Sequence, residues 1–271
     1  MRRIMIHRRK SFHSTGYLND DGMIRRHRYF EFDVNNTQII SGLFSTLSGQ
    51  EISVDWGDGS SRDVYTGTDQ AWSHDYGSAG NYVVRIFGSV ALTQFRMDRS
   101  GADISFDIAN LPAGLTVFYC SGSATIAGDI ANLPAGLTVF RCWSSGNTIT
   151  GDIARLPGGI TVFACSGHNT VFGDIANLPD GISYFYCGGD NTISDYSGKT
   201  WTTKPSDFYL IPASGGLSTA EVDQLLIDFD ADLTWASGDA IELTGANAAR
   251  SAASDAAVTN MTNEGATITT N

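Results

Sequence analysis

One ten-residue phrase occurs four times in this sequence and ends each time in a cysteine. It reads LPAGLTVFYC from residue 111, LPAGLTVFRC from 133, LPGGITVFAC from 156 and LPDGISYFYC from 178. The cysteines are 22, 23 and 22 residues apart, a period typical of a solenoid in which each repeat forms one coil on the last. Weaker copies at 92–97 and 206–210 place Met97 and Leu210 in the cysteine position, so we expect about six coils.

The repeated cysteine is expected to point into the coils as a small buried thiol. Cysteines at the same position of neighbouring parallel strands point the same way, whereas a disulfide needs them to face each other. No Cys-x-x-Cys pair or histidine cluster accompanies them, so we predict no metal and no cofactor. The four residues are Cys120, Cys142, Cys165 and Cys187.

The segment before the repeats contains short alternating runs, YFEFDV, EISVDW and NYVVRIF, between turn residues, a pattern typical of an antiparallel β-sandwich. In VDWGDGS (54–60) we expect Gly57 and Gly59 to supply positive φ, and Asp55 and Asp58 to accept hydrogen bonds from the turn amides. A metal or acid–base site formed by these carboxylates with His74 is the alternative. The turn is favoured because it uses both carboxylates locally.

These motifs resemble the PKD (polycystic kidney disease) domain over about 60 residues. Its WGDG is present at 56–59, and its later H-x-Y and G-x-Y-x-V patterns are matched by five residues: His74, Tyr76, Gly80, Tyr82 and Val84. The resemblance implies a spacer or adhesion module of an extracellular or virion-surface protein.

The repeat, I-x-x-L-P-x-G-[LI]-x-x-F-x-C followed by a turn and T-I-x-G-D-I, resembles leucine-rich repeats, particularly bacterial and phage-type ones. The resemblance implies that Leu115, Phe118 and Cys120 face inward and stack on the next coil at about 4.8 Å. Phenylalanine replaces the usual leucine, and the first coil has Ser123 and Ala124 where later coils have asparagine. We expect three asparagines to bond turn amides: Asn147, Asn169 and Asn191.

The sequence changes character near residue 213. LSTAEVDQLLIDFDADL (217–233) predicts a helix with a capping box of Ser218 and Glu221, and DAIELTGAN, SAASDAAVTNMTNEG and ATITT predict strand, helix and strand. The second helix is expected to bury Ala253, Ala256, Ala257 and Met261. The predicted fold is therefore mainly β, since a solenoid needs a terminal cap. Its parts are a basic arm (1–28), a PKD-like sandwich (29–88), a leucine-rich-repeat-like solenoid of about six rungs (89–212) and an α/β cap (213–271).

The formal net charge of −12 is unevenly distributed, because residues 1–28 carry eight Arg or Lys against two Asp, and the rest carries −18. Such a body is not expected to bind nucleic acid. No apolar run approaches the roughly 20 residues of a membrane helix, and the N-terminus lacks the apolar stretch of a secretory signal. We expect the arm to anchor the chain to an acidic surface through eight residues: Arg2, Arg3, Arg8, Arg9, Lys10, Arg25, Arg26 and Arg28.

Residues that alternate with the buried positions must face outward on the repeat sheet. They include an aromatic and arginine set that we call the stripe: Arg96, Tyr119, Arg141, Trp143, Tyr184 and Tyr186. Aromatic and arginine side chains dominate binding hot spots, and aromatic faces suit sugar rings. The stripe is thus a candidate ligand-binding face; cross-strand packing or coverage by a neighbouring chain is the equally weighted alternative.

No nucleophile elbow, Walker loop, HExxH or Rossmann fingerprint occurs, His168 is expected to be a solvated turn residue, and no enzyme is predicted. The predicted function is a bacteriophage virion surface protein, a tail fibre or tail-associated adhesin. The arm would dock on other virion proteins and the repeats would bind a host glycan or protein, in a homo-oligomeric or symmetric assembly without membrane insertion. The alternatives are a head fibre or capsid decoration protein, and a bacterial cell-surface adhesin.

Overall fold

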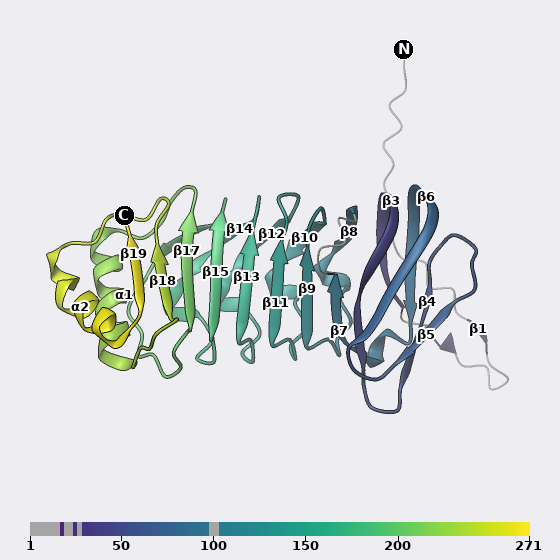
Figure 1. Cartoon of the computed structure of the whole chain (residues 1–271), viewed down its shortest axis with the longest axis horizontal. Helices are drawn as coiled ribbons and strands as arrows, with labels where there is room; N and C mark the ends of the chain where they lie inside the picture. Colours follow the sequence, from purple (N-terminus) through teal and green to yellow (C-terminus); the bar gives the residue numbers. More distant parts are fainter. Residues whose placement is uncertain (1–16, 19–23, 26–28, 98–102) are drawn as a thin grey trace, which may run out of the picture.

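A computed structural model of the chain describes residues 17–18, 24–25, 29–97 and 103–271. The fold is mainly β, as predicted, and one long mixed sheet of 17 described strands runs through it. The molecule is elongated, with an antiparallel module at one end, stacked parallel strands in the middle and two helices at the other end (Figure 1). A separate antiparallel pair joins β1 (Tyr17–Leu18) to β2 (Ile24–Arg25).

The N-terminal module is built on two long antiparallel strands, β3 (Tyr29–Thr46) and β6 (Gln70–Phe87), which pair along most of their length. The shorter strands β4 (Glu51–Asp55) and β5 (Asp63–Thr66) complete it. Each of the three alternating runs in the sequence lies in one of these strands, because every second residue reaches a common apolar core. That core contains Phe30, Phe32, Phe44, Trp56 and Trp72.

The repeats form two rows of parallel strands. The row that faces the viewer in Figure 1, the front row, has one strand for each repeat phrase and two further strands at its end. Its members are β7 (Leu92–Met97), β9 (Val117–Ser121), β11 (Val139–Trp143), β13 (Val162–Ser166), β15 (Tyr184–Gly189), β17 (Asp207–Pro212), β18 (Ala240–Leu243) and β19 (Thr267–Thr270). Neighbours pair in parallel without a register shift.

The second or back row carries the T-I-x-G-D motif of each repeat. Its strands are β8 (Asp103–Asp107), β10 (Thr125–Asp129), β12 (Thr148–Asp152), β14 (Thr170–Asp174) and β16 (Thr192–Asp195). Short 3-10 helices follow the first four: η2 (Ile108–Asn110), η3 (Ile130–Asn132), η4 (Ile153–Arg155) and η5 (Ile175–Asn177). In each, the aspartate caps the helix by accepting the amide two residues on, which explains the recurring G-D-I-A.

The core between the rows consists of columns of identical side chains. Six phenylalanines stack along the front row with consecutive ring centroids 5.0 to 6.0 Å apart: Phe95, Phe118, Phe140, Phe163, Phe185 and Phe208. The cysteine column runs beside them, with Met97 and Leu210 at its ends, and its members are at most 1% exposed. The inward cysteine column predicted from the repeat is therefore confirmed.

The recurring asparagines hold consecutive coils together. The side-chain carbonyl of Asn169 accepts the Ile149 amide of the preceding coil at 2.8 Å, while its Nδ2 donates to the Ser166 carbonyl of its own turn at 2.7 Å. Asn147 and Asn191 accept strand amides of the preceding coil in the same way. The predicted bonds to turn amides were wrong: the accepted amides belong to back-row strands, because the buried asparagine reaches across to the coil before it.

The N-terminal module closes one end of the stack. Residues 43–46 of β3 pair antiparallel with β7 and residues 33–35 pair with β8, so one strand covers the first edge of both rows. A Cβ atom at Gly42 would lie only 2.1 Å from the Arg96 carbonyl oxygen, so a glycine is required where β3 approaches β7. The η1 turn (Ser89–Ala91) leads from β6 into β7.

The other end is closed by α1 (Thr219–Asp232) and α2 (Asp255–Glu264), which lie behind the last front-row strands in Figure 1. The predicted capping box of Ser218 and Glu221 begins α1, and Phe229 packs against Phe208 of β17 at 5.2 Å. A short η6 turn (Ala252–Ser254) precedes α2.

Two expectations for the C-terminal region need correction. The strands predicted there continue the front row, which therefore has eight strands within the described residues, two more than the six counted from the repeat phrase. Ala257 and Met261 are buried as predicted, but Ala253 and Ala256 are exposed. Ser254 is buried in their place, because its hydroxyl donates to Asp223 of α1 at 2.6 Å.

Candidate functional site

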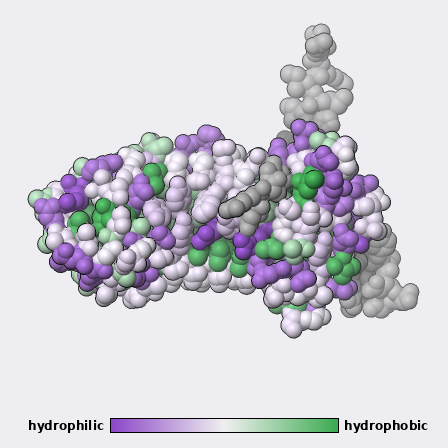
Figure 2. Space-filling view, in the orientation of Figure 1, coloured by the Kyte–Doolittle hydropathy of each residue, from purple (hydrophilic) through white to green (hydrophobic). Residues whose placement is uncertain are grey.

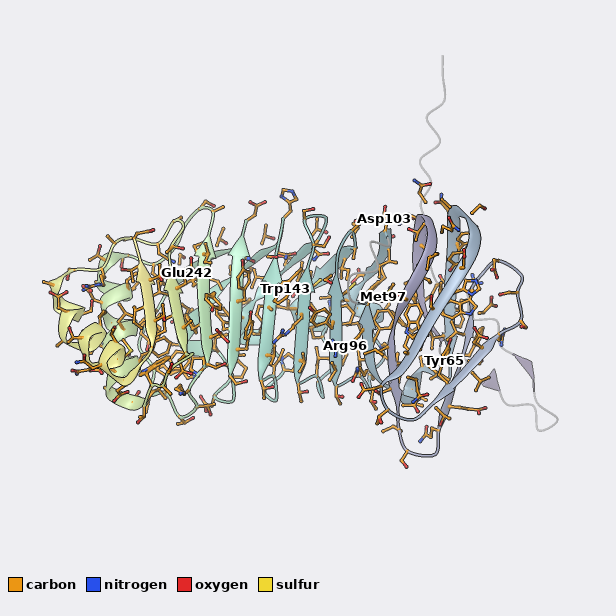
Figure 3. The ribbon with its side chains drawn as sticks, viewed as in Figure 1. Tyr65, Arg96, Met97, Asp103, Trp143 and Glu242 are labelled. Atoms are coloured by element: carbon orange, nitrogen blue, oxygen red, sulfur yellow. The ribbon has the colours of Figure 1, made fainter. Side chains whose placement is uncertain are left out.

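The stripe lies on the outer face of the front row, where Figure 3 labels Arg96 and Trp143. Arg96, Tyr119 and Arg141 are register partners on β7, β9 and β11, and the same row continues through Ala164 to Tyr186. Trp143 lies two residues beyond Arg141 and Tyr184 two residues before Tyr186, so both share this face. All six stripe residues are partly exposed.

The stripe side chains contact one another along the stack. The Arg96 guanidinium lies 5.2 Å from the Tyr119 ring centroid, and that of Arg141 lies 5.5 Å from Trp143 and 4.6 Å from Tyr184. Such cation–π contacts hold the guanidinium groups against the aromatic faces. The arginine and aromatic side chains therefore form one continuous surface.

Ala164 has the smallest side chain of this row. Trp143 on β11 and Tyr186 on β15 meet edge to face at 6.3 Å although β13 lies between their strands. The small side chain of Ala164 makes this approach possible, and Ala164 itself is fully buried. The other outward residues of β13, Val162 and Ser166, are also small, so the large side chains of this region come from the neighbouring strands β11 and β15.

The stripe continues beyond the residues predicted for it. Tyr209 of β17 is the register partner of Tyr186, and Glu242 of β18 follows Tyr209; Figure 3 labels Glu242 farther along the same row. The sequence signal for Tyr209 is Leu210 in the cysteine position, which puts the preceding tyrosine in the position of Tyr119. Glu242 has no such signal, because β18 lacks the repeat phrase.

Two tyrosine hydroxyls on this face, those of Tyr184 and Tyr209, stay protonated at neutral pH. Burial raises the pKa of Tyr184, an effect that Arg141 opposes and Asp207 strengthens. Burial and the 2.8 Å hydrogen bond that Tyr209 donates to Asp207 raise the pKa of Tyr209 to about 12. In Figure 2 the described residues seen in the middle of this face are mostly pale, of intermediate hydropathy.

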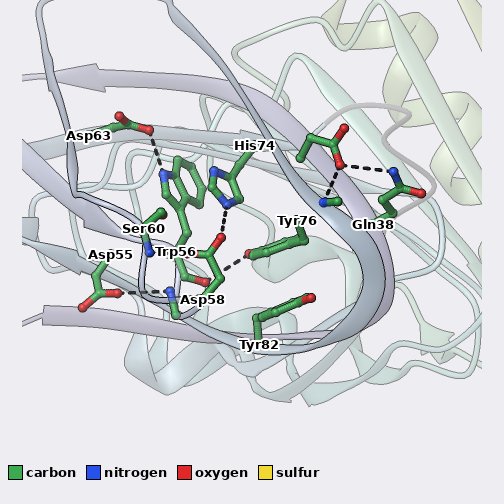
Figure 4. A network of polar contacts seen from close by, with 12 residues as sticks. Gln38, Asp55, Trp56, Asp58, Ser60, Asp63, His74, Tyr76 and Tyr82 are labelled. Atoms are coloured by element: carbon green, nitrogen blue, oxygen red, sulfur yellow. Dashed lines mark hydrogen bonds and ion pairs between the residues drawn. The ribbon is translucent and has the colours of Figure 1, made fainter.

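The WGDG turn uses its carboxylates as predicted (Figure 4). Asp55 accepts the Gly57 amide at 3.1 Å and Asp58 accepts the Ser60 amide at 2.9 Å. Both turn glycines, at positions 57 and 59, have positive φ. His74 Nε2 lies 2.8 Å from Asp58, and its ring stacks on Trp56 at 4.7 Å.

Burial by itself would raise the pKa of Asp58, but the hydrogen bonds from Ser60 and His74 outweigh it and lower the pKa to about 2. The carboxylate is therefore ionised and paired at neutral pH. This arrangement ties the turn to β6, which carries His74.

The anchoring residues predicted in the basic arm lie outside the described residues, except for Arg25, whose backbone is part of β2. His168 is exposed, as expected, and pairs with Asp190 of the next coil's turn at 2.8 Å.

Comparison with known proteins finds no matching family model, no matching curated protein and no matching solved structure. None of the described helices has the length and apolar character needed to span a membrane. The class of protein must therefore be inferred from the motifs and from the stripe.

Proposed function

We propose that this chain is a bacteriophage virion surface protein, a tail fibre or tail-associated adhesin, that binds its host through the stripe and docks on the virion through the basic arm. In this proposal the module of β3–β6 is a PKD-like spacer and the two rows form a leucine-rich-repeat-like solenoid. The helices, with β18 and β19, form its α/β cap. The protein acts by binding and catalyses no reaction.

The partly exposed stripe on the front row is the observation that supports this proposal most strongly. Aromatic and arginine side chains supply large contact areas and polar edges at little cost in conformational entropy, which suits them to recognition. A rigid stack of parallel strands holds them at fixed spacing. A binding role explains why arginine and aromatic side chains gather on this one face of the scaffold, whereas chance does not.

The layout of the chain supports docking by the arm. The eight basic residues precede the module, whereas the stripe lies beyond it on the repeats. The module and the C-terminal helices occupy opposite ends of the molecule (Figure 1). Attachment through residues 1–28 therefore leaves the front row free to meet a receptor.

Deletion of residues 1–28 from the phage-encoded chain tests the docking. The body should keep its melting temperature, because its core lies in the described strands and helices, while the chain disappears from purified particles. A control with the arm arginines replaced by lysine keeps the charge and should assemble. Antibody labelling of wild-type particles distinguishes a tail from a head location. Absence of the chain from wild-type particles would contradict the proposal, and normal occupancy of the deletion variant would place the anchor elsewhere.

A further inference from the structure

Arg141 differs from most other Arg and Lys residues of 29–271 because it forms no ion pair with a described carboxylate. Five of them form ion pairs with carboxylates at 4 Å or less: Arg62, Arg85, Lys199, Lys204 and Arg250. The Arg141 guanidinium lies against two aromatic rings, and within the described part of the chain no carboxylate or other acceptor binds it. In a protein with 29 acidic residues and 17 basic ones, an arginine at the centre of a surface cluster without an acidic partner needs a reason.

The aromatic side chains around Arg141 favour the binding of an anion to its guanidinium group. Its guanidinium is held between the Trp143 and Tyr184 rings, at 5.5 and 4.6 Å from their centroids. The N–H donors of a guanidinium lie in its plane, and no described acceptor binds those of Arg141. A partly buried guanidinium with no acceptor loses hydration without compensation, so an anion that accepts two of these hydrogen bonds gains more here than at an exposed arginine.

A second donor beside Arg141 also lacks an acceptor. The indole Nε1 of Trp143 is buried and makes no hydrogen bond to any described residue, which is unusual for a buried indole N–H. Trp143 lies on the strand next to that of Ala164 and meets Tyr186 beyond it. A ligand on this part of the stripe would thus meet ring faces, tyrosine hydroxyls, the guanidinium and, if the indole turns, a further N–H donor.

We infer that Arg141 binds the carboxylate of an acidic sugar, whose ring packs on the neighbouring aromatic side chains. This inference rests on the proposed binding role of the stripe and specifies its ligand class. A planar guanidinium matches a planar carboxylate through two parallel hydrogen bonds. A doubly charged phosphate or a nucleic acid would need several cations to offset the net charge of −12. Asp207, the register partner of Tyr184, and Glu242 on β18 are carboxylates and would repel an anion from the β17–β18 side, so the anion is placed at Arg141.

The test uses matched sugars. Oligosaccharides that carry uronic or sialic acids are compared with their carboxyl-reduced forms, and binding to the full chain is measured by calorimetry. The wild type should bind at least one carboxylated form about tenfold or more tightly than its reduced partner, and Arg141→Gln should remove this difference. Arg141→Lys keeps the charge without the bidentate geometry and should recover only part of it. Comparing the uronic acid sugars with the sialic acid sugars identifies which kind of acidic sugar the protein binds.

Arg155→Gln is the matched control, because Arg155 is an exposed arginine of η4 away from the stripe. It should bind the carboxylated sugar as tightly as the wild type does. If both variants lost the same affinity, the loss would come from the change in net charge alone, and the inference would be overturned. Equal wild-type affinity for carboxylated and reduced sugars would also overturn it. So would the absence of all sugar binding in a chain that still binds host cells through Trp143, a result that would leave the proposed function standing. Melting temperatures of the Arg141 variants close to the wild type exclude a folding defect.

Discussion

At the scale of single residues, the cysteine that ends each repeat phrase serves as a small apolar core residue. Cys142 is fully buried, and its Sγ accepts a hydrogen bond from Asn147 Nδ2 at 3.0 Å. Burial raises the pKa of the Cys142 and Cys187 thiols well above the usual range. Because the thiolate is the reactive form, these side chains are poor nucleophiles in the folded protein.

Alkylation with iodoacetamide measures this state directly. In denaturant without reductant all four cysteines should react, whereas the folded protein should react at none of them within the time that labels a free thiol completely. Two or fewer reactive thiols in denaturant would mean that cysteines pair, which would overturn the register of the coils.

The same alternation shows what the sequence can predict at this scale. Once Cys120 and Phe118 are assigned inward, Tyr119 must face outward, and the structure agrees for every member of the stripe. The contact between Trp143 and Tyr186 across Ala164 could not be predicted. It depends on side-chain size on three neighbouring strands, and the repeat pattern specifies only direction.

At the scale of elements, each coil depends on the asparagine of the next. The ladder extends into the C-terminal region, where Asn247 accepts the Leu217 amide at 2.9 Å and donates to the Leu210 carbonyl at 2.7 Å. LTGAN at 243–247 is thus a structural repeat that lacks the repeat phrase, with Leu243 in the cysteine position. The insertion of α1 and the loss of the LPxG phrase hide this relation from the sequence, so β18 was assigned to the cap alone.

Asn169→Ala tests the role of the asparagine ladder. The substitution leaves the buried Ile149 amide and the Ser166 carbonyl without their partner, and should lower the free energy of unfolding by about 1–3 kcal/mol. Urea denaturation followed by circular dichroism measures the change. His168→Ala, at the exposed neighbouring position, is the control and should stay within about 0.5 kcal/mol of the wild type. Equal stability of the two variants would show that the asparagine does not join the coils.

Helix faces near the C-terminus show a limit of the same kind. The pattern of alanines from η6 into α2 predicted a buried side that included Ala253 and Ala256, yet both are exposed. The side of α2 that is buried depends on how α2 meets α1, and the bond of Ser254 to Asp223 sets this contact. Short, alanine-rich helices carry too weak a periodic signal to specify it.

At the scale of the whole molecule, the described strands from β3 onward form one sheet that runs from the module to the final strand. An open stack would expose strand edges at both ends and invite pairing with other chains. Here β3 covers the first edge of both rows, and α1 and α2 cover the core behind the last front-row strands. The outer face of the front row, which carries the stripe, is partly exposed between these two closed ends.

The central claim is that the stripe on this scaffold binds a host surface, and Trp143→Ala tests it most directly. Host-cell binding and melting temperature are measured on the same purified variant. The loss of a large ring contact should weaken binding by about 2 kcal/mol or more, with little change in melting temperature because Phe140 and Cys142 beneath remain packed. Phe172→Ala, an aromatic residue of the back row that is 46% exposed, should bind as the wild type does. Normal cell binding of Trp143→Ala with a lowered melting temperature would contradict the account and make the stripe a packing surface.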